Sequence, residues 1–133
     1  MSERRLYPGK PLVGVGVLIR EGEKYLLIRR AAELDAGLWS IPGGLMELGE
    51  RAAEAARREA LEETGLDVVI EDVLSVVDKI VEDDEERIKY HFVIVDYLAK
   101  VRGGNLKASS DASDARWVES MKFPSYELSL TLV

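Results

Sequence analysis

The chain has 133 residues, of which 47% are apolar and 32% charged, and this balance predicts one globular domain over residues 1–133. Its net charge of −7 argues against a nucleic-acid or anionic-membrane surface, because both partners need a basic field. The absence of Cys excludes disulfides and thiolate metal sites. The N-terminal stretch lacks the apolar core of a signal peptide, and no apolar run reaches membrane-spanning length. We therefore expect a soluble, cytoplasmic protein.

The N-terminal part predicts a β-hairpin. An apolar, β-branched run at 11–19 predicts a buried first strand. Gly14 and Gly16 share one face of this strand, which suggests that another backbone or a ligand comes close there. A tight turn at 21–23 then leads to a second strand at 24–30 that pairs back on the first.

A glycine turn and a helix follow. A short strand at 38–42 is predicted to deliver Gly43 and Gly44, whose freedom of backbone conformation lets the main chain approach a metal or a phosphate closely. The helix is predicted from 51 to 64, and Gly65 is placed to end it. The apolar stripe that we expect to pack against a sheet consists of Ala53, Ala56, Ala60 and Leu61.

The C-terminal half predicts a second set of strands. Residues 66–81 predict a strand with a break near 71–72, and the acidic run at 82–86 predicts a solvated hairpin tip. A long strand at 87–101 carries apolar residues on both faces, so we expect both faces to be covered. The remaining predicted elements are a strand at 115–118 and a short helix from Ser125.

Three carboxylates gather on one face of the predicted helix. Glu59 is followed by Glu62 and Glu63 at helical i+3 and i+4 spacings, so all three project to the same side. Like charges at this spacing repel, and Arg57 and Arg58 offset only part of the repulsion. A divalent cation would offset more, and hard oxygen ligands of this kind suit Mg²⁺, with Mn²⁺ as the alternative.

The same stretch resembles the sequence motif of the Nudix hydrolase family, the Nudix box. Ala60 is small for its position, where a larger aliphatic residue is usual. The resemblance implies an α+β fold, a Nudix-type α/β/α sandwich with a mixed central sheet. The positions that match the box at its spacing are Gly44, Glu50, Arg58, Glu59, Ala60, Glu62, Glu63, Gly65 and Leu66.

The resemblance also implies a metal site. Glu59, Glu62 and Glu63 would bind the metal and act in catalysis, and the backbone carbonyl of Gly43 or Gly44 would complete the coordination. Glu63 or Glu59 would also orient the attacking water.

Other residues of the box receive supporting roles. Arg58 would hold Glu59 or Glu50 in place and belongs with the catalytic set. Gly44, Glu50 and Gly65 are assigned structural roles within the motif.

One further carboxylate often comes from a late loop in related enzymes. Asp111 and Asp114 are the candidates here, and Asp111 is the one that we assign as catalytic. If neither acts, the general base lies within the box, at Glu47, Glu59 or Glu63.

Four residues are assigned to substrate binding. Arg29 and Arg30 end the second predicted strand, where either an exposed strand end or a contact with phosphate explains them. Trp39 and Tyr90 are the aromatics best placed to line a base pocket, although a core role fits each of them as well. The residues assigned to substrate contact are Arg29, Arg30, Trp39 and Gly44.

The expected reaction is Mg²⁺-dependent hydrolysis of a pyrophosphate linkage in a nucleoside diphosphate derivative. The resemblance is strongest to ADP-ribose pyrophosphatase-like members, which would make AMP and ribose 5-phosphate from ADP-ribose. Two alternatives stay open, namely a mutator-type nucleoside triphosphate pyrophosphatase and a catalytically silent nucleotide-binding regulatory domain. The expected partner is a small-molecule nucleotide, not a nucleic acid or a membrane, and a homodimer stays open.

Overall fold

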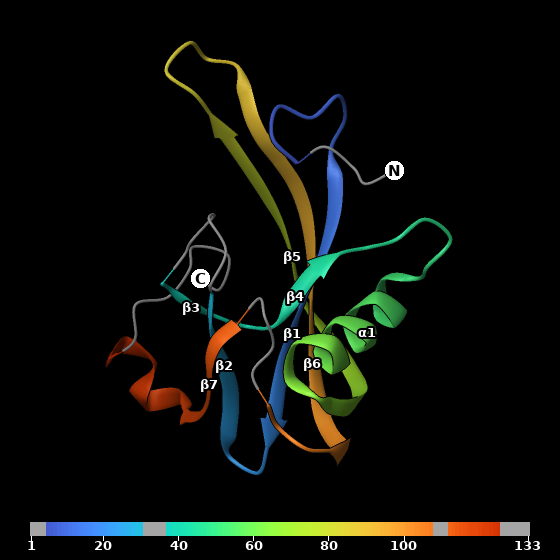
Figure 1. The fold of residues 1–133 in the computed structure, drawn as a ribbon, viewed down its shortest axis with the longest axis vertical. Coiled ribbons are helices and arrows are strands. Elements are labelled where there is room, and N and C mark those ends of the chain that lie inside the picture. Colours follow the sequence, from blue (N-terminus) through green and yellow to red (C-terminus); the bar gives the residue numbers. More distant parts are fainter. Residues whose placement is uncertain (1–4, 31–36, 108–111, 126–133) are drawn as a thin grey trace.

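The structure is a computed structural model that describes residues 5–30, 37–107 and 112–125. One helix packs against a sheet from which a long two-stranded arm extends (Figure 1). Among the described residues no helix is both long and apolar enough to cross a membrane. The elements in chain order are β1 (Leu12–Glu21), β2 (Lys24–Arg30), β3 (Trp39–Ser40), β4 (Gly43–Leu45), α1 (Ala52–Thr64), β5 (Leu66–Glu82), β6 (Ile88–Gly104), β7 (Ala112–Glu119) and the 3₁₀ helix η1 (Ser120–Ser125).

The seven strands form one mixed sheet. Its main order is β3-β2-β1-β6-β5, with β4 paired to β1 and β7 paired to β2. The β1–β6 pair is parallel, whereas the other pairs are antiparallel. This arrangement confirms the predicted α+β class with a mixed sheet. The helix predicted from Ser125 lies outside the described residues apart from its first position, which ends η1.

On the edge that faces away from β6, strand β1 divides its pairing between two partners. Its last residues pair with β2, while Gly14 and Gly16 pair with Leu45 and Gly43 of β4. A Cβ at Gly43 would overlap the carbonyl oxygen of Val15, so only glycine fits this close approach. The prediction that Gly43 and Gly44 form a turn is therefore wrong, because their pairing with the Gly-rich strand β1 makes them part of strand β4.

Helix α1 begins and ends as its sequence predicts. Gly65 adopts φ 78°, the left-handed conformation of a helix end, and its N–H donates to the carbonyl of Leu61 at 2.9 Å. The side facing the sheet is made of Ala55, Ala56 and Ala60, all fully buried. Their small side chains let the helix lie close to the sheet.

The predicted apolar stripe of α1 is wrong at one position. Leu61 is 53% exposed, because it lies about 100° around the helix from buried Ala60 and so points away from the sheet. Glu63 and Thr64 are buried in its place. The helix therefore turns a carboxylate, and not a leucine, toward the sheet.

The β5–β6 pair is longer than the helix that covers it. Each strand has 17 residues, and the register shifts between Ile70 and Asp72, where a break is predicted. A 17-residue strand extends about 55 Å, whereas the 13-residue helix α1 extends about 20 Å. The expectation that both faces of the long strand are covered is wrong at its outer end, where Ile88 is 40% exposed. The neighbouring β5 side chains Val73, Val76 and Ile80 are also exposed.

The tip of this arm is tied to the N-terminal segment. The hydroxyl of Tyr7 donates to Asp83 Oδ2 at 2.7 Å, and Arg87 Nε donates to the same carboxylate at 3.0 Å. The hydrogen bond from Tyr7 is the largest cause that lowers the pKa of Asp83 to about 2. The acidic run at 82–86 is solvated as predicted except at Asp83, whose side chain is only 13% exposed and accepts the hydrogen bond from Tyr7.

This contact predicts a pH-dependent stability. The substitution Tyr7→Phe should lower the melting temperature at neutral pH, because Asp83 loses a donor. The carboxylate contributes stability above its unfolded-state pKa of about 4 and loses it as the pH falls through about 2. The difference in melting temperature between wild type and variant should therefore decrease as the pH falls from about 4 to about 2, as measured by circular dichroism melts. Tyr25→Phe, which removes a hydroxyl with no hydrogen bond to a described residue, is the control, and a pH-independent difference would contradict the assignment.

Candidate active site

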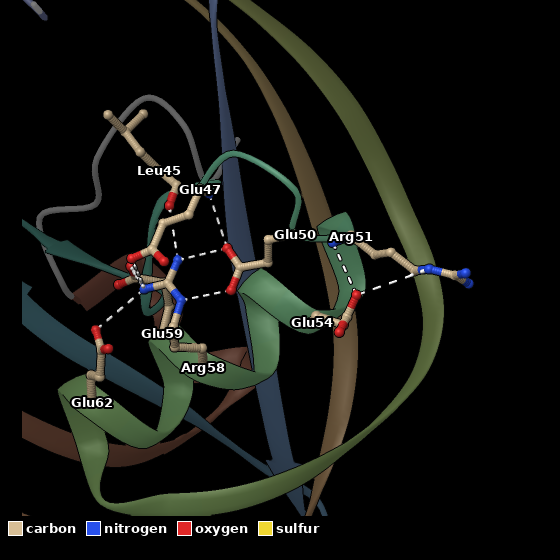
Figure 2. A network of polar contacts seen from close by, with 8 residues as sticks. All are labelled: Leu45, Glu47, Glu50, Arg51, Glu54, Arg58, Glu59 and Glu62. Atoms are coloured by element: carbon tan, nitrogen blue, oxygen red, sulfur yellow. Dashed lines mark hydrogen bonds and ion pairs between the residues drawn. The ribbon is translucent and has the colours of Figure 1, made fainter. Parts of the chain in front are cut away.

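Arg58 is the centre of a network of carboxylates at the N-terminal half of α1 (Figure 2). Its Nε donates to Glu50 Oε2 at 2.7 Å and its Nη2 to Glu50 Oε1 at 2.9 Å, a two-pronged contact. Its Nη1 donates to Glu59 Oε1 at 2.7 Å and to Glu62 Oε2 at 3.3 Å. The Glu50 hydrogen bonds are the largest cause that raises the pKa of Arg58. One guanidinium thus orients three carboxylates.

Arg58 also fixes the loop that precedes the helix. Its Nη2 donates to the carbonyl oxygen of Leu45 at 3.0 Å, and the backbone N–H of Glu47 donates to Glu50 Oε1 at 3.0 Å. Hydrogen bonding to Arg58 lowers the pKa of Glu50, whose side chain is 14% exposed. The predicted Glu50–Arg58 pair is present and joins the loop to the helix.

Glu59 lies directly against Gly44 of strand β4. A Cβ at Gly44 would come within 2.5 Å of Glu59 Cδ, so a side chain there would displace the carboxylate. Burial raises the pKa of Glu59, since its side chain is only 13% exposed. The pair with Arg58 opposes this shift, while the charge of Glu62 adds to it. Glu59 therefore sits between one cation and another carboxylate.

Glu63 lies one turn further along the helix and is 7% exposed. Its Oε2 accepts a hydrogen bond from the backbone N–H of Gly43 at 3.4 Å. The interaction with Glu63 is a minor cause that lowers the pKa of Glu59. Glu62 is 59% exposed at the rim. Ionised carboxylates gathered on one helix face repel one another, and a divalent cation between them would offset that repulsion.

The donor set suits a hard divalent cation. It consists of carboxylate oxygens from neighbouring turns of one helix and backbone carbonyls of strand β4, which are the ligands that Mg²⁺ prefers. Within the described ranges no three His, Cys, Asp or Glu side chains converge as a ready-made metal cage. The Glu59–Glu63 contact is consequently the part of the site that fits a bound ion.

The residues predicted to contact substrate lie on β2, β3 and β4. Arg29 Nε donates to the carbonyl of Gly37 at 3.2 Å, which holds this arginine at the strand end. Trp39 packs under the guanidinium of Arg116, 5.8 Å from the ring centroid. The side chain of Arg30 lies outside what the structure describes.

Of the two carboxylates predicted to come from a late loop, the structure describes one. Asp111 lies outside the described residues. Asp114 is on β7 opposite Arg29, and its Oδ2 accepts a hydrogen bond from Arg116 Nε at 3.2 Å.

Tyr90, a candidate for the base pocket, stacks on Phe92 with ring centroids 6.1 Å apart, along the arm strand β6.

Sequence reasoning missed two backbone contacts of the site. The Leu45 carbonyl is a backbone acceptor for Arg58, and the residue type at 45 gives no sign of it. The sequence also gives no sign that the Gly43 N–H binds Glu63, because the direction of this N–H depends on the pairing of β4 with β1.

The network predicts that Arg58 cannot be replaced by lysine. Arg58→Lys should lower the free energy of unfolding by about 1–3 kcal/mol, because an ammonium cannot keep the two-pronged contact and leaves carboxylates without donors. Arg57→Lys, at an exposed ion pair with Asp67, should change it by less than about 1 kcal/mol. Urea unfolding of the metal-free proteins measures both, and equal effects would show that Arg58 is a surface charge.

Comparison with known proteins agrees with this geometry. The model of the NUDIX domain matches residues 10–130. The ADP-ribose pyrophosphatase of Methanocaldococcus jannaschii is 34% identical over 124 residues, which cover 93% of this chain and 70% of that protein. The human 8-oxo-dGDP phosphatase NUDT18 is 38% identical over 112 residues, which cover 84% of this chain and 32% of that protein.

A solved structure shares the fold. The MutT protein of Methanosarcina mazei Go1 superposes with a TM-score of 0.74 at 28% identity, covering 91% of this chain and 87% of that one. The family match spans nearly the whole chain and includes the carboxylate network around Arg58. The chain therefore belongs to the Nudix family of pyrophosphohydrolases.

Proposed function

We propose that this protein hydrolyses ADP-ribose to AMP and ribose 5-phosphate in a Mg²⁺-dependent reaction in the cytoplasm. The observation that carries the reaction type is the pair of buried carboxyl groups, Glu59 and Glu63, held against Gly43 and Gly44 of strand β4. The choice of substrate is supported by the similarity to the relative named ADP-ribose pyrophosphatase.

The proposed Mg²⁺ would be held by Glu59, Glu62 and Glu63 together with a backbone carbonyl of Gly43 or Gly44. A bound Mg²⁺, or Mn²⁺ in its place, neutralises pyrophosphate charge and makes bound water a nucleophile near neutral pH. Without a cation, the acidic helix face would repel the substrate phosphates.

The protein's own groups position the reaction. Arg58 holds Glu59 with a charge-assisted hydrogen bond, and the Gly43 N–H holds Glu63. Glu59 or Glu63 is proposed to orient the water and accept its proton; for Glu59, burial and the charge of Glu62 raise the pKa, which favours proton uptake. Asp111, Asp114 and Glu47 are the alternative bases.

Nucleotide sanitation is the second candidate. The relative named 8-oxo-dGDP phosphatase is 38% identical to this chain, although the chain spans only 32% of its length. A mutator-type enzyme would release pyrophosphate from a nucleoside triphosphate. A catalytically silent domain is the third candidate, and the complete set of box carboxylates speaks against it.

A substrate panel separates these candidates. The panel should contain ADP-ribose, NADH, dinucleoside polyphosphates, and ordinary and oxidised nucleoside di- and triphosphates, each with Mg²⁺ and with EDTA. We expect AMP and ribose 5-phosphate from ADP-ribose, resolved by anion-exchange chromatography. Pyrophosphate release from a triphosphate with inert ADP-ribose would replace the proposal by the second candidate, and no turnover at all would favour the third.

The metal assignment predicts a large effect at Glu63. Glu63→Gln keeps the size of the side chain but removes its charge, so kcat should fall by roughly 10²-fold or more while the fold is kept. Glu54→Gln, on the exposed side of the same helix, should leave kcat within about twofold of wild type. Steady-state kinetics with circular dichroism on both variants tests this, and full activity of folded Glu63→Gln would remove Glu63 from the ligand set.

A further inference from the structure

Strand β5 is the last strand of the sheet and pairs on one side only. It ends the order β3-β2-β1-β6-β5, and the two strands off this path pair with β1 and β2. The N-terminal segment lies on the other side of β6, where the Tyr7 N–H donates to the Lys89 carbonyl oxygen at 2.8 Å (Figure 1). Among the described residues no strand therefore covers the outer edge of β5, and its backbone groups are open to another strand.

The outer half of β5 also exposes apolar side chains. Val76 is 63% exposed, and Val73 and Ile80 are each more than half exposed. These three project from the same face, because their pairing partners on β6 are separated by even numbers of residues. Exposed apolar groups on an unpaired edge mark a surface that another chain can cover.

This edge lacks the features that keep an edge strand from pairing. Between Leu66 and Glu82 there is no proline, and the register with β6 is continuous from Ser75 to Val81. The register shifts lie before and after this run. A regular, mostly apolar stretch of strand is thus left open.

The charges of β5 match those of a second copy laid antiparallel to it. The β6 partners of Asp72 and Lys79, residues 98 and 92, each lie three positions from residue 95, the partner of Val76. A two-fold axis at Val76 therefore places Asp72 of each copy opposite Lys79 of the other. An axis at Asp78 would instead set two aspartates against each other, which is destabilising.

The two ends of the arm are complementary as well. Its tip carries the exposed acidic residues 84–86. At its base, the exposed guanidinium groups of Arg57 and Arg102 both bind the single carboxylate of Asp67, which leaves an excess of positive charge. Antiparallel pairing brings the acidic tip of each copy to the basic end of the other, so the two charges attract.

We propose that this protein forms a symmetric dimer in which two copies pair antiparallel along β5, with Val76 on the two-fold axis. The exposed side chains and backbone edge of β5 offer on the order of several hundred Å² per chain, near the roughly 800 Å² that each partner buries in a stable interface. Each copy uses its own β5 edge, so the assembly closes at two copies. The carboxylates around Arg58 take no part, and the proposal is independent of the proposed function.

Gel filtration with light scattering tests the association. Wild type should be a dimer at about 100 µM protein, and Val76→Lys should raise the dissociation constant about 10-fold or more, because two ammonium groups would meet at the axis. The exposure of Val76 should let this variant fold, as checked by circular dichroism. Val13→Lys, at an exposed valine of β1, is the matched control and should leave the dimer unchanged.

Three results of this experiment overturn the proposal. They are a monomeric wild type, a Val76→Lys variant that dimerises as tightly as wild type, and an open series of oligomers larger than a dimer.

A single cysteine tests the position of the axis. The chain has no Cys, so Val76→Cys can form a disulfide only between copies. Directly opposed residues of antiparallel strands have Cα atoms about 4.5–5.5 Å apart, which a disulfide can span. Diamide, which accepts the two thiol hydrogens, should convert Val76→Cys to a covalent dimer on non-reducing electrophoresis. Met121→Cys, exposed on η1, should stay a monomer, and equal cross-linking of both variants or none of Val76→Cys overturns the pairing.

Exchange of charges tests the cross-strand contact. Asp72→Lys and Lys79→Asp should each raise the dissociation constant several-fold, because each sets like charges opposite one another. The double variant restores opposite charges and should return the dissociation constant to within about twofold of wild type. Sedimentation equilibrium measures all four proteins, and a double variant weaker than both single variants overturns the proposed register.

Discussion

The guanidinium of Arg58 is the contact on which the site depends. It joins three elements of the motif, because it binds the loop carbonyl of Leu45, the loop carboxylate of Glu50 and the helix carboxylate of Glu59. Each of these acceptors would have to find another donor if the guanidinium were absent. Its planar shape also explains why the carboxylates keep fixed directions although the helix face is strongly acidic.

Backbone geometry supplies the other half of the site. Strand β1 pairs with β4 over its first half and with β2 at its end, and this division brings Gly43 and Gly44 beneath the helix. Glycine is required there by contact, since a Cβ would strike Val15 at one position and Glu59 at the other. The acidic cluster is therefore held by main-chain pairing as much as by side chains.

The sequence predicts those features that depend on local spacing. The helix limits, the left-handed Gly65 and the Glu50–Arg58 pair follow from the fixed positions of the box. The mixed α+β sheet also follows, through the family resemblance. Whether Glu59, Glu62 and Glu63 bind metal remains a prediction.

Features that depend on distant pairing could not be predicted in this way. The exposure of Leu61 depends on which face of α1 meets the sheet, and that of the arm residue Ile88 depends on how far α1 reaches over it. The burial of Asp96 depends on β1 lying beside β6, and nothing in the sequence around residue 96 indicates it. Amphipathic patterns give the faces of an element, but not which partner covers them.

The parallel pairing of β1 with β6 has a consequence for the order of folding. Strand β1 leaves the ribosome early, yet its lateral partner, which sets Leu12 beside Phe92, is synthesised only after α1 and β5. Closing so large a loop is entropically costly and slows folding of chains rich in such contacts. The acidic helix is consequently made after β1–β4 but before β5 and β6, so the nascent chain carries the helix before the sheet beneath it is complete.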